Sequence, residues 1–203
     1  MKLVELFFPN YCLLCNRPIR YNELLCPECL GDLSSGPIAL YEDQRAFKSY
    51  FYGRYESKLR DLILLYKNSH HWRLSKILAS FLVKTMKTYS SSAELLTWVP
   101  SSLSSLEERG FDTMALIAKI TSDMTGIPLK RILESRATSN KRGMTVEQRR
   151  SLVKNSFSAI GKVYEDVALI DDVFTTGSTI SECVRILKNA GVGSVTVYCI
   201  ARA

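Results

Sequence analysis

The sequence of 203 residues lacks any apolar run long enough to cross a membrane, so we expect no membrane insertion. It also lacks the features of a secretory signal, because Glu5 interrupts the first residues, MKLVELFFP, which contain no extended apolar segment with a small-residue cleavage site. We therefore predict a cytoplasmic protein. Acidic residues are fewer than basic ones, 20 against 27, and the resulting net charge of +7 favours anionic partners such as polyphosphates or nucleic acid.

Histidine is scarce, and this argues against a histidine metal site. The two histidines, His70 and His71, are adjacent in the sequence. Adjacent side chains rarely converge on one ion and no third ligand is evident, so a solvated turn is the favoured interpretation.

Cysteine, in contrast, is present in a pattern typical of a metal centre. Four of the six cysteines form two CxxC pairs that are separated by ten residues, namely Cys12, Cys15, Cys26 and Cys29. Each pair can wrap a metal from a tight turn, and tetrahedral zinc is the usual occupant of four thiolates. Two reactive disulfides or an iron centre are the alternatives. With no fifth ligand in evidence, the predicted zinc site is closed and structural.

The stretch Val167 to Thr179, VALIDDVFTTGST, carries the strongest signal for a functional site. An unbroken apolar run, Val167 to Ile170, is typical of a strand that is buried on both faces of a parallel sheet. Two carboxylates, Asp171 and Asp172, follow directly, and a loop of hydroxyl side chains around Gly177 comes next. We expect the site to lie at the carboxyl end of this strand.

A helix is predicted after the loop, since apolar residues recur at helical spacing from Ile180 to Ala190 and Gly191 suits a left-handed terminating position. Thr179 and Glu182 have the spacing of a capping box. The start of such a helix presents unpaired N–H groups and the positive end of the helix dipole to an anion, which describes a phosphate cradle. The acids would repel a phosphate, so we expect them to bind sugar hydroxyls or Mg²⁺. The simpler alternative is that the acids only end a strand and the threonines only cap a helix.

The remaining periodicity predicts one α/β domain with a parallel sheet flanked by helices, preceded by a small zinc-knuckle module. We place the module at residues 1–35 and the larger domain at residues 36–203, with a linker of Ser, Gly and Pro between them. The expected helices are Lys58 to Lys67, Leu74 to Met86 and Phe111 to Met124; the expected strands are Leu95 to Pro100, Leu129 to Leu133 and, closing the sheet, Val195 to Ala201.

Several other segments admit two interpretations each. The aromatic stretch Phe47 to Tyr55 is more typical of a buried strand than of a surface that stacks bases. Lys67 could complement its helix dipole or reach a phosphate, and Arg109 could bind a phosphate or pair with Glu107. The basic segment from Arg136 to Gly143 is either a solvated loop or a mobile loop that closes over a polyphosphate, and its charge would also attract single-stranded nucleic acid.

The order of these motifs resembles the ComF family, which combines an N-terminal zinc finger with a type I phosphoribosyltransferase domain. The resemblance covers nearly the whole chain: tandem CxxC, a helix ending in Lys67, Val99-Pro100, Arg109-Gly110-Phe111, Arg136 in a basic loop, and LIDDVFTTGST. The RGFN pattern of the family reads Arg109-Gly110-Phe111-Asp112 here, and a Gln usual in the basic loop is replaced near Lys141.

The resemblance implies a site for phosphoribosyl pyrophosphate (PRPP) with Mg²⁺. In such a site Asp171 and Asp172 contact the ribose hydroxyls, and the loop backbone from Thr175 to Thr179 binds the 5-phosphate. The whole stretch that contributes to this site is Asp171, Asp172, Val173, Phe174, Thr175, Thr176, Gly177, Ser178 and Thr179. The loop after the first core strand of this fold receives the pyrophosphate, which points to Ser101, Ser102 and Arg109; Lys67 and Arg136 are further candidates.

Three functions fit the sequence. The first is Mg²⁺-dependent phosphoribosyl transfer with release of pyrophosphate, in which Thr175, at a position occupied by a carboxylate in 6-oxopurine enzymes, disfavours that substrate class. The second is a non-catalytic PRPP sensor. The third, suggested by the link of the family to DNA uptake and natural transformation, is the handling of single-stranded DNA, with other DNA-uptake proteins such as a ComF-operon helicase as further partners.

Overall fold

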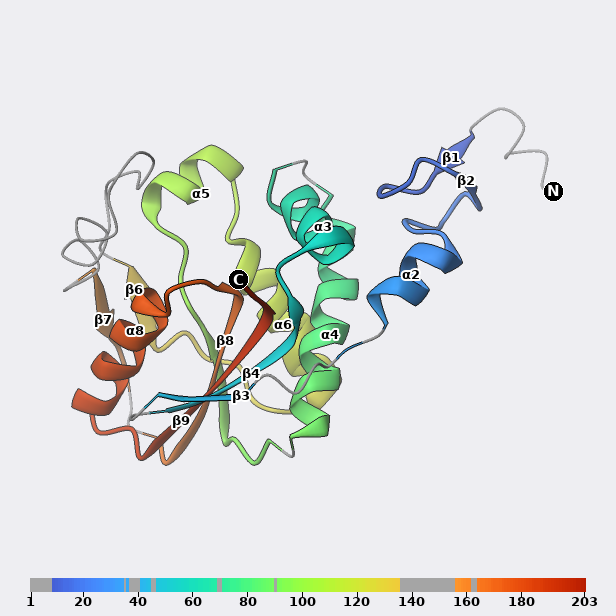
Figure 1. Cartoon of the computed structure of the whole chain (residues 1–203). Helices are drawn as coiled ribbons and strands as arrows, with labels where there is room; N and C mark the ends of the chain where they lie inside the picture. Colours follow the sequence, from blue (N-terminus) through green and yellow to red (C-terminus); the bar gives the residue numbers. More distant parts are fainter. Residues whose placement is uncertain are drawn as a thin grey trace.

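A computed structural model of the chain describes residues 9–34, 36, 41–44, 47–68, 71–89, 91–135, 156–161 and 164–203 (Figure 1). Within these ranges the largest sheet has five strands in the order β3-β4-β9-β8-β5, of which the last four are parallel. Their bounds are β3 Tyr41–Gln44, β4 Phe47–Arg54, β5 Leu95–Trp98, β8 Asp166–Phe174 and β9 Ser194–Arg202. The predicted parallel sheet flanked by helices is therefore confirmed.

The central strand β8 is buried on both faces, and its side chains alternate between two apolar clusters. Ala168 and Ile170 pack with helices α3 (Ser57–Asn68), α4 (Ser75–Thr88) and α6 (Thr113–Thr125), whereas Val167 and Leu169 pack with α8 (Ser178–Asn189). Figure 1 shows α8 on one side of the sheet and the other three helices on the opposite side. All four apolar residues are at most 1 % exposed, so the continuous apolar run reflects a strand covered by helices twice.

Two expectations about the sheet are wrong. The last strand does not close the sheet at an edge, because β9 lies between β4 and β8. Residues Leu129 to Leu133 do not form a strand of this sheet. Leu129 makes a single parallel bridge to Leu96, and the strand begins only at β6 (Leu133–Ser135), which pairs with β7 (Phe157–Ala159) in a separate antiparallel ribbon.

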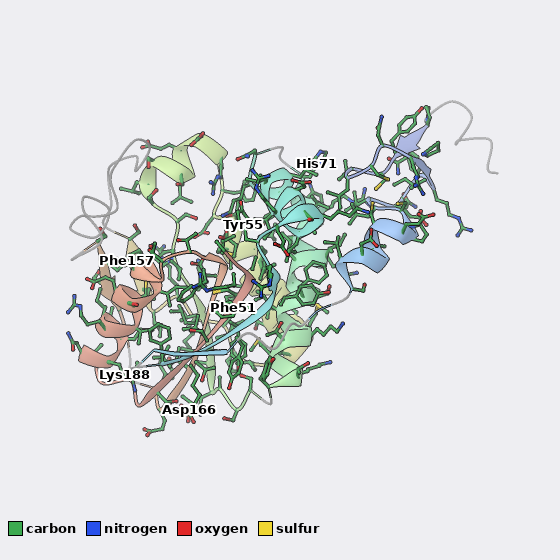
Figure 2. All side chains as sticks on the ribbon, viewed as in Figure 1. Phe51, Tyr55, His71, Phe157, Asp166 and Lys188 are labelled. Carbon is green, nitrogen blue, oxygen red and sulfur yellow. The ribbon has the colours of Figure 1, made fainter. Side chains whose placement is uncertain are left out.

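The aromatic stretch forms β4 and belongs to the core, as its favoured interpretation predicted. Phe51 is fully buried (Figure 2), and Tyr52 stacks on Phe81 of α4 with ring centroids 4.0 Å apart. The strand continues through Gly53 to Arg54. Of the histidine pair, His70 lies outside the described residues, and His71 precedes the 3-10 turn η1 (Trp72–Leu74).

The cysteine module, which we define as residues 9–34, contains the hairpin β1 (Asn10–Tyr11) and β2 (Pro18–Ile19) and the helix α2 (Pro27–Leu33). It contacts the rest of the chain through the Tyr52 hydroxyl, which donates to the Leu33 carbonyl, and through Arg73, which donates to the Asn22 carbonyl at 3.0 Å. Its domain boundary at residue 35 stays a prediction. Among the helices of the described ranges, none combines the length and the apolar character needed to cross a lipid bilayer.

Candidate functional site

The two acids lie in the last part of β8, which is still paired with β9 there. The pairing of β5 with β8 ends at Trp98 and Ile170, so Asp171 and Asp172 stand just past the carboxyl end of β5. Asp172 has the same parity along the strand as Ile170 and accordingly faces the side of α3. This position, at the carboxyl edge of a parallel sheet, is where ligands bind in open α/β folds.

An ion pair with Lys67 identifies α3 as part of the site. The Lys67 Nζ lies 2.7 Å from Asp172 Oδ2, and the two side chains are only 22 % and 15 % exposed. Asp171 Oδ1 accepts the N–H of Asp172 at 2.9 Å. Of the roles considered for Lys67, the structure therefore shows a third, which is to balance the charge of the acidic pair.

Burial, followed by the neighbouring charge of Asp172, raises the pKa of Asp171 to about 8, and the Lys67 ammonium acts in the opposite direction. Two carboxyls so close cannot both be ionised cheaply without a cation. The pair thus combines a carboxyl whose pKa is raised with one that is paired with the Lys67 ammonium. A divalent cation would add the positive charge that two carboxylates need, and sugar hydroxyls would donate hydrogen bonds to them. The pair therefore suits either partner.

The loop between β8 and α8 turns on Gly177, whose φ is 70°. A Cβ atom there would lie 2.5 Å from Cζ of the Phe174 ring, so both the conformation and the space require glycine. Gly177, the N-cap of α8, has no side chain that could cap this helix, and the Ser178 N–H donates to the Thr176 hydroxyl at 3.5 Å. The next N–H groups of the first turn are available to an anion beside the Thr176 and Ser178 hydroxyls, which lie 2.9 Å apart.

The capping box predicted for Thr179 and Glu182 is wrong. Because the left-handed Gly177 places the helix start at Ser178, Thr179 lies inside the first turn. The Glu182 carboxylate instead accepts from the Arg185 guanidinium at 2.7 and 2.8 Å. The remaining residues of the stretch are placed differently: Thr175 is exposed, Val173 is partly buried against the cluster of α3 and α4, and Phe174 is 1 % exposed beneath Gly177.

Arg202, which we did not predict as a site residue, supports this loop from the end of β9. Its Nη1 donates to the Thr175 carbonyl at 2.7 Å, and its guanidinium lies 5.0 Å from the centre of the Phe174 ring. The register of β8 with β9 pairs Phe174 with Arg202, so this contact follows from strand pairing across 28 residues. Local sequence patterns contain no signal for such a partner.

The loop after β5 lies at the same sheet edge, but its hydroxyls are engaged within the protein. Ser102 is the N-cap of the short helix α5 (Leu103–Arg109), which we did not predict, and Ser101 donates to Asp112 at 3.1 Å. Asp112 in turn caps α6 and accepts from Trp98 Nε1 at 3.1 Å. The Asp found in place of the RGFN asparagine is thus a capping residue in this chain.

Tyr66 connects this loop with the acid pair. Its hydroxyl donates to the Thr113 carbonyl at 2.7 Å. Burial, followed by the charges of Asp112 and Asp172, raises the pKa of Tyr66, while Arg109 acts in the opposite direction. The charges of these three side chains therefore act on the Tyr66 hydroxyl. Arg109 is partly buried at the end of α5; Arg136 and the rest of the basic segment lie outside the described residues.

The four cysteines of the module form one cluster whose sulfur atoms all lie within 4.8 Å of one another. The Cys15 and Cys26 sulfurs are 3.5 Å apart, far longer than a disulfide bond and near the edge of about 3.8 Å that a tetrahedron with zinc–sulfur bonds of about 2.3 Å requires. Cys12, Cys26 and Cys29 are buried, and Cys15 is exposed. The donor set and its spacing fit a tetrahedral metal ion such as zinc.

The parallel sheet, the acid pair and the glycine loop together define an α/β protein with a candidate ligand site at the carboxyl edge of its sheet. No protein-family model matches the chain. The chain is 30 % identical over 207 residues to competence protein F of Haemophilus influenzae, an alignment that covers 97 % of this chain and 86 % of that protein. The chain therefore belongs to the competence protein F family.

More distant relatives carry related names. Competence protein ComFC of Streptococcus pneumoniae is 26 % identical over 159 residues, covering 73 % of this chain and 65 % of that protein. DNA utilization protein YhgH of Escherichia coli K12 is 24 % identical over 211 residues, covering 94 % and 89 %.

Solved structures with likeness to this chain include phosphoribosyltransferases. Glutamine PRPP amidotransferase from B. subtilis matches with a TM-score of 0.44 and 23 % identity, over 62 % of this chain and 25 % of that chain. The purine phosphoribosyltransferase from Pyrococcus horikoshii matches with a TM-score of 0.39 and 15 % identity, over 64 % and 82 %. Both TM-scores are low, so family membership rests on the sequence relatives alone.

Proposed function

We propose that this protein binds PRPP with Mg²⁺ at the carboxyl edge of β8 and transfers the phosphoribosyl group to a nucleophile. The observation that carries the proposal is the juxtaposition, within one strand-loop-helix unit, of the Lys67-balanced acid pair and the start of α8. The first suits the ribose hydroxyls and a cation, and the second suits the 5-phosphate.

In the proposed reaction, the bond between C1 of the ribose and the pyrophosphate oxygen breaks, and its electron pair leaves with the pyrophosphate. The nucleophile forms the new bond to C1 and releases its proton. Positive charge develops on the ribose, and Asp172 stabilises it through the ribose hydroxyls in this proposal. Mg²⁺, when bound, neutralises the departing pyrophosphate. Ser101, Ser102 and Arg109 are the proposed pyrophosphate ligands, and Arg136 from the basic segment is a further one.

The test is a calorimetric titration of the zinc-loaded protein with PRPP, with and without Mg²⁺. We expect saturable, Mg²⁺-dependent binding that the variant Asp171→Asn/Asp172→Asn weakens by more than about 100-fold, since it removes two charge-assisted contacts. The matched control is Asp123→Asn, which alters an exposed carboxylate paired with Lys119 on α6. Folded wild-type protein that does not bind PRPP would reject the proposal.

Binding and transfer are separable. If PRPP binds but no candidate nucleophile accelerates pyrophosphate release above the uncatalysed rate, the protein is the non-catalytic sensor. The relatives named competence protein and DNA utilization protein favour a role with DNA, so we further propose single-stranded DNA and other DNA-uptake proteins as partners. DNA binding should fall steeply with salt, and PRPP should compete with it if the surfaces overlap.

A further inference from the structure

The Asp112 side chain joins the two ends of a long connection. Strand β5 ends at Trp98 and helix α6 begins at Thr113. The connection between them contains the β5 loop, which we define as residues 99–102, and the short helix α5. Trp98 Nε1 donates to Asp112 Oδ2 at 3.1 Å, so the last residue of β5 is bonded to the residue that precedes α6. The Asp112 carboxylate therefore closes the connection at its base.

The two oxygens of this carboxylate have different partners. Oδ1 accepts from the Met114 and Ala115 N–H groups at 3.0 and 3.2 Å, which caps α6, and from the Ser101 hydroxyl at 3.1 Å. Oδ2 accepts from Trp98. An asparagine caps a helix about as well as an aspartate, but it carries a donating amide in place of the second oxygen. Capping alone therefore does not require Oδ2, whereas the Trp98 contact does.

The β5 loop begins beside the acid pair and is held at three points. The Val99 N–H donates to the Ile170 carbonyl, directly before the acids, at 3.0 Å. Ser102, at the other end of the loop, caps α5. Between these two points, Ser101 is bonded to Asp112. The position of the loop therefore depends on where the Asp112 carboxylate stands.

Helix α3 fixes that position. The Tyr66 hydroxyl donates to the carbonyl of Thr113, the residue after Asp112, at 2.7 Å. Lys67, the next residue of α3, pairs with Asp172 at 2.7 Å. The same turn of α3 therefore holds both the start of α6 and the acid pair, and a loop bonded to Asp112 keeps its place relative to the acids.

We propose that Asp112 is a positioning residue, which through Oδ2 and Trp98 clamps the β5 loop in the conformation that receives the pyrophosphate part of PRPP. This inference deepens the proposed function and rests on it, because that function assigns Ser101, Ser102 and Arg109 to the pyrophosphate. A preformed loop loses less conformational freedom when the ligand binds, and this raises affinity. The ribose 5-phosphate part is assigned to the acid pair and the start of α8, so the clamp acts on one part of the ligand only.

Asp112→Asn is the selective variant, because it keeps an acceptor for the N–H groups of α6 and removes the acceptor of Trp98. We expect its affinity for pyrophosphate with Mg²⁺ to fall about 10-fold and its affinity for ribose 5-phosphate to stay within about two-fold of wild type. Calorimetry of the zinc-loaded, full-length proteins measures both. Asp123→Asn is the matched control, since it removes the same charge from an exposed carboxylate of α6 that pairs with Lys119. Equal losses for the two ligands, or no loss for pyrophosphate, overturn the proposal.

Trp98→Phe removes the donor of the same hydrogen bond. We expect it to lose pyrophosphate affinity to a similar extent, and Asp112→Asn/Trp98→Phe to lose no more than either single variant, because the partners share one interaction. Additive losses would show that the two side chains act separately, and they would refute the clamp.

A measurement without ligand separates the clamp from the proposed function. The chain has two tryptophans, of which Trp72 is 61 % exposed, so Trp98 supplies the only indole N–H in Trp72→Phe. We expect NMR to show that this N–H exchanges with heavy water at least about 10-fold faster once Asp112→Asn is added. Faster exchange in a protein that binds neither PRPP nor pyrophosphate would reject the proposed function and leave the clamp. Unchanged exchange would refute the clamp whether or not PRPP binds.

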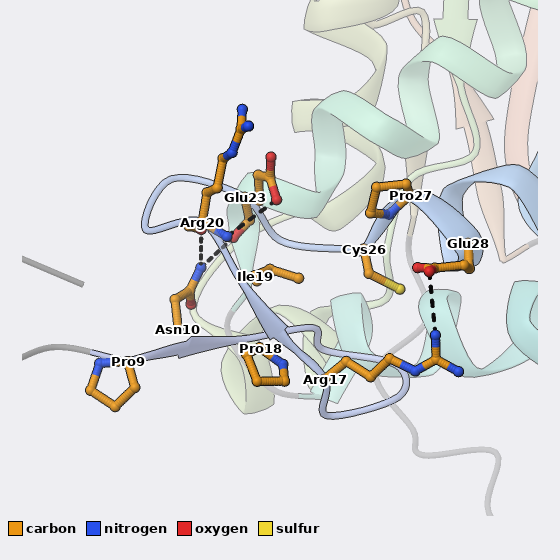
Figure 3. Close-up of a pocket in the computed structure, with 10 residues that line it drawn as sticks. All are labelled: Pro9, Asn10, Arg17, Pro18, Ile19, Arg20, Glu23, Cys26, Pro27 and Glu28. Carbon is orange, nitrogen blue, oxygen red and sulfur yellow. Dashed lines mark hydrogen bonds and ion pairs between the residues drawn. The ribbon is translucent and has the colours of Figure 1, made fainter. Parts of the chain in front are cut away.

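The cysteine module offers a second place for an anion, and the pyrophosphate titration needs a control for it. Arg17 and Arg20 line a groove of about 470 Å³ on this module, and the Arg17–Glu28 ion pair, 3.3 Å long, lies across the groove (Figure 3). Arg20→Gln removes one of these cations and leaves the β5 loop unchanged. We expect Asp112→Asn to cause the same loss of pyrophosphate affinity in the Arg20→Gln background. A loss that disappears there would place the pyrophosphate on the module and overturn the proposal.

Discussion

The cysteine centre and the acid-pair site are built in opposite ways. All four cysteines come from one segment of 18 residues, Cys12 to Cys29, and their spacing brings them together. The acid-pair site and its loop gather Lys67 from α3, Asp172 from β8 and Arg202 from β9. The cysteine spacing typical of a zinc site can be recognised in a sequence because the chain between the ligands is short. The acid-pair site, in contrast, exists only after the sheet has formed.

This difference predicts that substitutions in the cysteine centre lower the stability of the protein, whereas substitutions in the acid-pair site lower its affinity for a ligand. The largest effect is expected for Cys26→Ser, which removes a proposed metal ligand from the buried cluster that also contains the apolar residues of α3. The melting temperature should fall by at least about 10 °C, or about 3 kcal/mol for a chain of this size, with loss of bound zinc. Thermal unfolding and zinc content measure both effects. Cys183→Ala, altered at a buried cysteine of the other face, should retain one zinc per chain.

Gly177→Ala tests the loop of the second site. Alanine disfavours the φ of 70°, and its methyl group would clash with the Phe174 ring. We expect a loss of about 1–3 kcal/mol in the free energy of unfolding and a loop that no longer binds PRPP tightly. Chemical denaturation and calorimetry measure the two effects. A variant with wild-type stability and affinity would show that the loop tolerates another conformation.

Whether a feature could be predicted from the sequence depends on whether local or long-range contacts determine it. Residues close in the sequence determine strand β8, the loop glycine, the CxxC pairs and helix α3. These predictions agree with the structure. The placement of β9 inside the sheet and the Arg202 contact depend on pairing between distant strands, which no local pattern encodes. The capping box failed for a local reason, since a left-handed glycine moved the helix start.

The pH dependence of the free energy of unfolding tests Asp171 without involving the cysteine centre. Because burial raises the pKa of Asp171 to about 8, the folded protein binds more protons than the unfolded chain between about pH 4 and pH 8. This group therefore makes the free energy of unfolding fall as pH rises through that window, and Asp171→Asn should remove its contribution. Denaturant titrations at pH 5.5, 7 and 8.5 compare the two slopes; equal slopes would contradict the assignment.

The same proton should appear in ligand binding. The proposed binding of Mg²⁺ and PRPP requires the ionised form of Asp171, so affinity should rise with pH until about pH 8 and protons should be released on binding. Lys67→Met removes the charge that lowers the pKa of Asp171, so its affinity profile should move to higher pH. Calorimetry in buffers of different ionisation enthalpy counts the protons released.

The smallest effect is expected at Arg202, where the long-range character of the second site can be tested most directly. Arg202→Ala removes the donor to the Thr175 carbonyl but leaves Gly177 and Phe174 in place. We expect PRPP affinity to fall about 5–10-fold, equivalent to about 1 kcal/mol, with a melting temperature within a few degrees of wild type.

Arg202→Lys keeps the charge but loses the planar group that lies over the Phe174 ring, so it should restore only part of the affinity. Arg185→Ala is the matched control, since Arg185 pairs with Glu182 on nearby α8 without contacting the loop carbonyl. Wild-type affinity in Arg202→Ala would mean that the packing of Phe174 beneath Gly177 is sufficient to hold the loop. The loop would then be as locally determined as the cysteine centre, and the contrast between the two sites would be confined to the acid pair and Lys67.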